Sequence, residues 1–218
     1  RRGPRGPKRP APAPMLDRAL LGLLRPPLGG AARRLAAAGV SADAVTLCGL
    51  ALGGAAAVAI ALRQPLLGLA FIAASRLADG LDGEVARATA PTDRGAFLDI
   101  TLDFLFYASV PLAFAWADPA ANALAAAVLL AAFIGTGSSF LAFAVLAERR
   151  GLKSTGYPSK GFYFLGGLTE GTETIACFAL MCLVPQHFAW WAYGFATLCA
   201  ITAGMRIAHG AAVLARPL

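Results

Sequence analysis

Long apolar segments decide what this chain can fold into. The segment from Ala44 to Leu62 contains no charged residue. Five similar runs follow it, at about 65–85, 95–117, 119–147, 161–185 and 187–215. A helix needs about 20 apolar residues to cross the hydrocarbon core of a bilayer. Of the 218 residues, 58% are hydrophobic and 14% charged, whereas soluble domains average roughly 45–50% and about 25%. The sequence therefore predicts a membrane protein with six spans, which leave no room for a separate soluble domain.

The length of the apolar runs distinguishes between the two kinds of structure that can span a membrane. Only helices and closed β-barrels satisfy every backbone polar group in lipid. A barrel would show strands of about ten residues with alternating polarity, and no such pattern is present in the sequence. The predicted fold is therefore an all-α bundle of six transmembrane helices, which occupies residues 41–218.

The chain before the first span divides into two parts. Residues 1–14 are rich in Pro, Arg and Gly without apolar periodicity, so a disordered basic tail is expected. Met15 is expected to be the natural start. From there leucines recur at helical spacing with arginines on the other side, which is typical of an amphipathic helix in the membrane interface. This helix is predicted within a juxtamembrane region at 15–40 and ends at Pro26 and Pro27.

Basic and aromatic residues indicate the orientation. Basic residues crowd the connections on the side of the N-terminus, namely Arg87, Arg94, Arg149, Arg150, Lys153 and Lys160. The opposite connections carry only Arg63, and tryptophans mark that end of the spans. Because basic loops stay in the cytoplasm, both termini are predicted to be cytoplasmic in a multi-pass protein of the inner (cytoplasmic) membrane. Nine of 19 Lys and Arg lie in the first 34 residues, which suits anionic membrane lipid rather than nucleic acid.

Four aspartates interrupt the second and third apolar segments. Asp79 and Asp82 are three residues apart, and Asp99 and Asp103 are four apart, so each pair shares one helical face. A short cytoplasmic turn joins the two segments and should bring these faces together. Carboxylates at membrane depth are costly, and converging carboxylates need a counter-charge. Mg²⁺ or Mn²⁺ is the expected counter-charge, because these ions prefer oxygen ligands.

Two divalent ions in such a cage would suit a particular chemistry. Ions about 4 Å apart can hold a pyrophosphate and stabilise both the attacking and the leaving oxygen of a displacement. Gly83 and Gly95 remove side chains next to the acids, so a ligand or a neighbouring backbone could approach closely. Arg87, one turn beyond Gly83, could meet a phosphate or an aspartate. The predicted site therefore lies at the cytoplasmic end of these two spans.

Two alternatives compete with this interpretation. The acids could form buried ion pairs with Arg76, Arg87 and Arg94 that merely hold helices together. They could also serve a divalent-cation transporter, because transporters bind ions through intramembrane carboxylates. The acids lie within about two turns of the cytoplasmic ends and form no chain across the bilayer, which disfavours a transport pathway.

The acids belong to a longer pattern, which resembles the DxxDGxxARx7GxxxDxxxD motif of the CDP-alcohol phosphatidyltransferase family. All eight fixed positions match: Asp79, Asp82, Gly83, Ala86, Arg87, Gly95, Asp99 and Asp103. The resemblance implies transfer of a phosphatidyl or substituted phosphate group from a CDP-linked lipid, such as CDP-diacylglycerol, to an acceptor hydroxyl. CMP is released, and Mg²⁺ or Mn²⁺ is required. The family is commonly dimeric, which leaves a homodimer as an expectation.

The resemblance also implies roles for individual residues. Asp79, Asp82 and Asp99 would bind metal, and Asp103 would be the general base that also touches the second metal. The CDP moiety would contact Asp82, Gly83, Ala86, Arg87 and Gly95.

The acceptor site is the least specified part of the prediction. Charged residues on and around the fifth and sixth spans are the candidates, namely Lys153, Lys160, Glu170, Glu173 and Arg206. Glu173 and Arg206 lie at similar depth, so they either form a buried structural pair or line a pocket for the acceptor. A phosphorylated acceptor would need several of the cations. The sequence does not choose between these alternatives.

Overall fold

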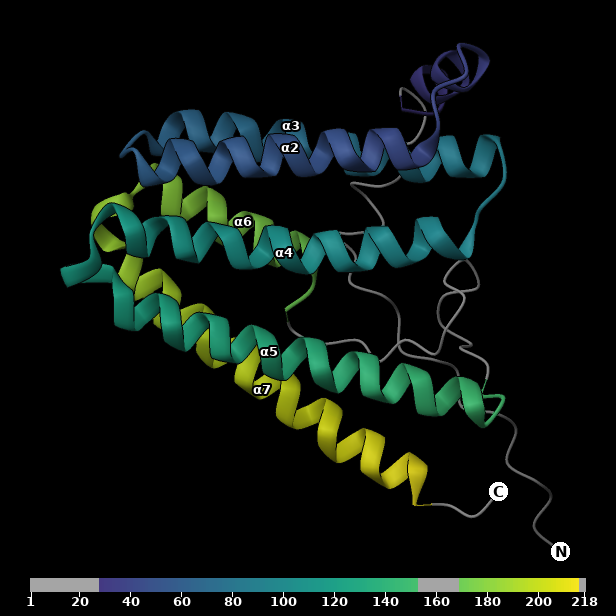
Figure 1. Cartoon of the computed structure of the whole chain (residues 1–218). Helices are drawn as coiled ribbons and strands as arrows, with labels where there is room; N and C mark the ends of the chain where they lie inside the picture. The colour runs from purple at the N-terminus through teal and green to yellow at the C-terminus, as the bar shows by residue number, and fades with distance from the viewer. Residues whose placement is uncertain (1–27, 153–168, 216–218) are drawn as a thin grey trace, which may run out of the picture.

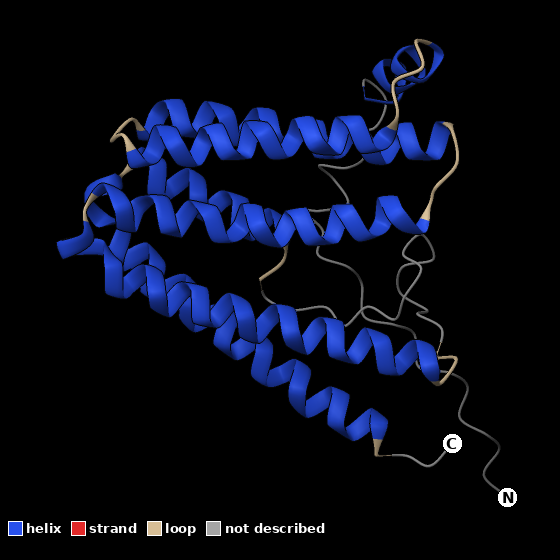
Figure 2. Cartoon of the chain, in the orientation of Figure 1, coloured by secondary structure: helices blue, strands red, loops and turns tan. Residues whose placement is uncertain are grey.

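A computed structural model of the chain describes residues 28–152 and 169–215, and every element within these ranges is helical (Figure 2). The elements are α2 (Ala42–Ala61), α3 (Pro65–Ala88), α4 (Asp93–Ala117), α5 (Pro119–Arg149), α6 (Gly171–Leu183), the 3-10 turn η1 (Pro185–His187) and α7 (Phe188–Leu214). A further helical segment covers 28–37. The predicted all-α fold is confirmed, and the expected first four runs agree with α2 to α5 within a few residues.

Four helical segments are long and apolar enough to cross a membrane: α2, α4, α5 and the continuous Pro185–Leu214. The protein is therefore an integral membrane protein. At 24 residues, α3 is about 36 Å long, so its charged residues rather than its length distinguish it from these four. The described part of the predicted fifth span is α6, with 13 residues, and 161–168 lie outside the described residues. The count of six spans thus stays a prediction.

The helices form a bundle in which α4 lies between the pair α2 and α3 and the pair α5 and α7 (Figure 1). Helix α2 packs against both α3 and α4, while α4 also packs against α5, α5 against α7, and α6 against α3 and α7. Aromatic side chains fill the core between the later helices. Phe114 stacks on Phe188 with 4.6 Å between ring centroids. Phe178 meets Phe106 and Phe133 edge to face, with centroid distances of 6.2 Å and 6.3 Å. The pair α5 and α7 diverges from α2, α3 and α4 toward the end that carries the α3–α4 turn.

Local capping explains where the helices around the site begin. Ser41 accepts a hydrogen bond from the Ala44 N–H at 3.2 Å and starts α2. Thr92 caps α4 in the same way through the Gly95 N–H at 3.0 Å. Because a capped helix start has a defined position, the short turn between α3 and α4 is held at the end where α4 begins.

The segment before α2 differs from its prediction. Pro26 and Pro27 were expected to end a helix ahead of a basic stretch, yet residues 28–37 are helical. The physical reason is that Pro is favoured just before and within the first turn of a helix. Ala32 is buried with Val45 of α2 and Val85 of α3, whereas the neighbouring arginines are exposed. The described helix therefore packs on one end of α2 and α3; 15–27, where the interfacial helix was predicted, lie outside the described residues.

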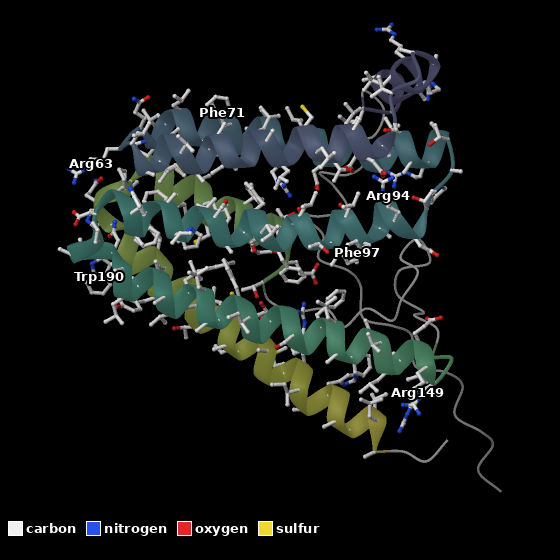
Figure 3. All side chains as sticks on the ribbon, viewed as in Figure 1. Arg63, Phe71, Arg94, Phe97, Arg149 and Trp190 are labelled. Carbon is white, nitrogen blue, oxygen red and sulfur yellow. The ribbon has the colours of Figure 1, made fainter. Side chains whose placement is uncertain are left out.

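Labelled side chains mark the two ends of the bundle (Figure 3). Arg63 and Trp190 lie at one end, and Arg94 and Arg149 at the other. This separation agrees with the predicted division of the connections into two sides. Which end faces the cytoplasm stays a prediction.

Candidate functional site

The acidic residues of α3 and α4 meet in one place. Carboxylate oxygens of Asp79, Asp99 and Asp103 lie within 4.8 Å of one another. Asp79 comes from α3 and the other two from α4, because the spacing of three and four residues keeps each pair on one helical face. Asp82 lines the same pocket. The predicted convergence of the two faces is confirmed, while the roles of these residues stay predictions.

The pocket has three walls, and α2 supplies one that the sequence did not indicate. Its lining consists of Thr46, Gly49 and Leu50 from α2, Arg76, Asp79 and Asp82 from α3, and Asp99, Leu102, Asp103 and Phe106 from α4. Asp99 is exposed, whereas Asp79 and Asp103 are half-buried. The acids are thus reachable from the surface at Asp99 and increasingly enclosed toward Asp103 and Phe106.

Thr46 holds Asp82 in the wall of the pocket. Its hydroxyl lies 2.7 Å from the Asp82 Oδ2 and 3.0 Å from the Ala42 carbonyl oxygen one turn earlier. Asp82 is only 6% exposed, and a buried carboxylate needs such a donor. Because Asp82 is bound to α2, its carboxylate is not one of the three that converge within 4.8 Å. No pattern in the sequence pointed to Thr46.

Arg76 is the cation of the pocket. Its Nη1 lies 2.7 Å from the Asp103 Oδ1 and 3.6 Å from the Asp79 Oδ1. The guanidinium carbon also lies 4.1 Å from the centre of the Phe106 ring, a distance typical of a cation–π contact. Sequence reasoning named Arg76 only in the alternative of structural ion pairs. Its spacing of three residues from Asp79 is the signal that could have placed it in the site.

The other two arginines of that alternative do not pair with the four acids. Arg87 bonds to Glu84 at 2.7 Å on the surface of α3, and Arg94 lies 3.4 Å from Asp43 of α2. The alternative of structural ion pairs is therefore unsupported for Arg87 and Arg94, whose described partners are Glu84 and Asp43. Among the described residues that line the pocket there are four carboxylates and one arginine, a composition that suits the binding of cations.

The two motif glycines have different surroundings. A Cβ at Gly95 would lie 3.2 Å from the Thr92 Oγ1, so this glycine permits the tight first turn of α4. A Cβ at Gly83 would meet the Arg87 guanidinium at 3.5 Å, which is an ordinary contact. Ala86 is half-buried on α3. Small side chains therefore line the end of α3 that Arg87 flanks.

The donor set fits a hard divalent cation. Three carboxylate oxygens from two helices lie close enough to share one ion, and oxygen ligands of this kind suit Mg²⁺ and Mn²⁺. Asp79, Asp99 and Asp103 are thus the residues that could hold a metal directly. Asp82 would join them after a small movement away from Thr46.

A second polar group lies at the start of α6. Glu170 and Glu173 form a capping box in which the Glu173 carboxylate accepts the Glu170 N–H at 3.0 Å. Arg206 of α7 is buried, donates to the Thr136 carbonyl oxygen at 3.2 Å, and is acted on by the charge of Glu170. Of the two alternatives for Glu173 and Arg206, the buried pair is not formed in the described part of the chain, where Glu173 instead caps its own helix.

The remaining acceptor candidates are placed as follows. Lys153 and Lys160 lie outside the described residues. The start of α6 is close to the acidic pocket, because a Cβ at Gly171 would lie 3.5 Å from the Tyr107 Oη. Tyr107 follows Asp103 by one helical turn on α4. Glu170 is thus brought near the pocket by Tyr107, as the sequence alone could not show.

Comparisons with known proteins give a consistent result. The model of the CDP-alcohol phosphatidyltransferase family matches residues 40–204. The inner membrane protein YnjF of Escherichia coli (strain K12) is 52% identical over 196 residues, which cover 90% of this chain and 95% of that protein.

Two crystal structures of Mycobacterium tuberculosis phosphatidylinositol phosphate synthase (PgsA1) share the fold. The structure with CDP-DAG bound has a TM-score of 0.70 at 21% identity, over 84% of this chain and 93% of that chain. The complex with manganese and citrate has a TM-score of 0.67 at 22% identity, over 84% and 88%. The family match over most of the chain, and the motif acids gathered in one pocket, lead to one conclusion: the chain belongs to the CDP-alcohol phosphatidyltransferase family.

Proposed function

We propose that the chain is an integral membrane phosphotransferase of phospholipid biosynthesis. It transfers a phosphatidyl or other substituted phosphate group from a CDP-linked lipid, such as CDP-diacylglycerol, to an acceptor hydroxyl and releases CMP. The observation that carries this proposal is the approach of the Asp79, Asp99 and Asp103 oxygens to within 4.8 Å. Family membership supports the reaction class, and the CDP-DAG complex of PgsA1 supports the kind of donor.

Metal binding is assigned to all four acids, with room for two ions of Mg²⁺ or Mn²⁺. The manganese complex of PgsA1 supports a divalent metal. When bound, the ions would neutralise the donor pyrophosphate and make CMP a better leaving group. Asp79 supplies an oxygen from α3 and Asp99 one from α4. Asp82, which Thr46 holds in the wall of the pocket, would join them after a small movement.

Asp103 is assigned the role of general base. An alcohol is a poor nucleophile until its proton is accepted as the new bond forms. The acceptor oxygen would form a bond to the lipid-side phosphorus, the bond from this phosphorus to the CMP phosphate would break, and the Asp103 carboxylate would take the proton. Arg76 lies 2.7 Å from Asp103 and restricts the orientation of its carboxylate.

The donor is assigned to the exposed side of the pocket. Its CDP moiety would contact Asp82, Gly83, Ala86, Arg87 and Gly95, where small side chains leave room at the end of α3. Arg87 has a side chain that is 57% exposed, so its guanidinium is accessible to a phosphate even while it bonds to Glu84. The acyl chains would remain between helices in the bilayer.

The acceptor is assigned to the side of the pocket where α6 begins. Tyr107 follows Asp103 by one turn of α4, and its hydroxyl lies beside Gly171 at the start of α6. Glu170 directly precedes Gly171, and its charge acts on Arg206. The other candidates for this site remain Lys153, Lys160 and Glu173. Glu173 would act indirectly, because its carboxylate accepts the Glu170 N–H and so helps to position Glu170. A small hydroxyl compound that enters there would approach the pocket from the end nearest Asp103.

The membrane arrangement is proposed to include six spans, with α3 and a segment at 161–185 in addition to the four apolar helices. Both termini and the acidic pocket would face the cytoplasm, as the basic residues at the Arg94 and Arg149 end support. The inner membrane location follows YnjF. The proposal also includes a basic tail at 1–14, an interfacial helix within 15–40 and a six-span domain at 41–218. The protein is further proposed to form a homodimer.

Purified protein tests the reaction directly. We would incubate it with CDP-diacylglycerol, Mg²⁺ or Mn²⁺, and a panel that includes glycerol 3-phosphate and an inositol phosphate, and measure CMP and lipid product. CMP release that requires metal and one acceptor, and that is lost in D103N but kept in D93N, supports the proposal. Metal uptake into proteoliposomes without CMP release would instead favour a transporter.

A further inference from the structure

The guanidinium of Arg76 lies among the acids of the proposed metal site. A metal site is normally lined by groups that bind the cation, and a positively charged side chain is not such a group. The Arg76 Nη1 contacts the Asp103 Oδ1 at 2.7 Å and approaches the Asp79 Oδ1 at 3.6 Å. These two residues also supply two of the three oxygens that converge within 4.8 Å. An ion bound by that convergence would therefore lie beside a permanent positive charge.

Arg76 is not bonded as a purely structural arginine would be. Its Nη2 has Ser75 as a partner at 3.3 Å, and its Nε is buried without a hydrogen-bond partner in the described part of the chain. Buried structural ion pairs are usually retained with their donors satisfied. The Phe106 ring lies 4.1 Å from the guanidinium carbon of Arg76. This contact holds the positively charged guanidinium beside the carboxylates.

We propose that Arg76 opposes divalent-metal binding at Asp79 and Asp103 until a CDP-linked donor is bound. This inference rests on the metal role that the proposed function gives to these acids. Among the described lining residues, four carboxylates balance two divalent ions, so the charge of Arg76 is then a positive excess. The negative pyrophosphate of the donor removes this excess. Metal and donor binding are therefore coupled through Arg76, and the coupling is reciprocal.

The pocket makes this coupling strong. Like charges repel more in a partly enclosed site than in water, because the effective dielectric constant is lower. The side chain of Arg76 is 18% exposed, so water screens its charge only in part. Removal of the charge should strengthen Mn²⁺ binding to the donor-free protein, whereas a charge-conserving change should not.

Mn²⁺ affinity of the full-length protein in detergent, measured by electron paramagnetic resonance of free Mn²⁺, tests the proposal. No acceptor is added, so that binding is observed apart from transfer. In the wild type, CDP-diacylglycerol should increase the affinity about tenfold or more. R76M should bind Mn²⁺ about tenfold more tightly without donor and respond less than about threefold to it. R76K should behave as the wild type.

Two further variants control this comparison. R63M removes a positive charge at the opposite end of the bundle and should leave the Mn²⁺ affinity unchanged. R76Q replaces R76M if the latter does not fold, because its side chain is neutral but polar. Melting temperatures are measured for every variant, so that a loss of folded protein is not mistaken for a loss of coupling.

The outcomes separate the two proposals. R76M or R76Q with wild-type Mn²⁺ affinity overturns the role of Arg76 while the metal site stands. An equal increase in Mn²⁺ affinity in R76K and R76M also overturns the role of Arg76, because the increase would then not depend on the charge at this position. Wild-type protein that binds no Mn²⁺, with or without donor, overturns the metal site and this inference together.

Discussion

Arg76 of α3 and Asp103 of α4 form an ion pair, with 2.7 Å between Nη1 and Oδ1, although 27 residues separate them in the chain. The pair links two helices that both pack on α2. It restricts the carboxylate proposed as the base, since one of its oxygens is held by the guanidinium. The other oxygen remains for the proton of an acceptor.

The first prediction concerns Asp103. D103N keeps the shape of the side chain but removes its ability to accept a proton, so turnover should fall by about 10²–10⁴-fold. Donor binding should change much less than turnover, because the CDP contacts are assigned elsewhere and Asp103 would affect them only through the bound metal. CMP release and the Michaelis constant for CDP-diacylglycerol measure the two effects. Activity within tenfold of the wild type would remove Asp103 from the role of base.

The second prediction concerns the metal ligands. D79N and D99N should each weaken Mn²⁺ binding, because both residues supply converging oxygens. D93N is the matched control: Asp93 lies in the first turn of α4 and does not line the pocket. Titration of activity and of bound Mn²⁺ gives the affinities. The same metal dependence in D79N, D99N and D93N would show that the site is wrongly placed.

The third prediction concerns the start of α6. Because Glu173 caps its helix, E173A should lower the free energy of unfolding by about 0.5–2 kcal/mol. Its coupling to R206M in a double-mutant cycle should be below about 0.5 kcal/mol.

A second double-mutant cycle, between Glu170 and Arg206, provides the comparison for the cycle between Glu173 and Arg206. The charge of Glu170 acts on Arg206, so E170Q and R206M should show a coupling of about 0.5–3 kcal/mol. Denaturant unfolding in detergent gives all the values. Strong coupling of Glu173 and weak coupling of Glu170 to Arg206 would contradict the observed arrangement.

The fourth prediction compares two adjacent glycines of α2. A Cβ at Gly53 would lie 2.7 Å from the Phe106 Cδ2, whereas a Cβ at Gly54 would meet nothing within 4 Å. G53A should therefore destabilise the protein by about 1–3 kcal/mol through overpacking. It should also lower activity, because Phe106 lines the pocket and holds Arg76. G54A should be neutral or slightly stabilising. Equal melting temperatures for both variants would argue against this packing.

The fifth prediction concerns orientation. All four cysteines are free, so a variant without them can carry single new cysteines. A cysteine at Ala90, in the α3–α4 turn, should react with an impermeant thiol reagent from the cytoplasmic side. Ala90 is preferable to Thr92, which caps α4. A cysteine at Gln64 should react from the opposite side. The reverse pattern of labelling would invert the proposed topology.

Features that depend on neighbours along the chain were predictable from the sequence. The apolar run that begins at Ala44 became α2, and Ser41 caps it as its side chain and position indicated. The spacing of Asp79 with Asp82, and of Asp99 with Asp103, placed each pair on one face. Helical periodicity and capping are local properties, so residue order is sufficient to predict them.

Contacts between helices were decided only by the tertiary structure. Asp82 bonds to Thr46 rather than joining the three converging acids, and Arg76 alone among three candidate arginines pairs with the cluster. Glu173 caps α6 instead of pairing with Arg206. Charged side chains are long, and several partners lie within reach of each. Which partner is chosen depends on the rotation and separation of packed helices, and these follow from ridge and groove packing of whole surfaces rather than from spacing in the sequence.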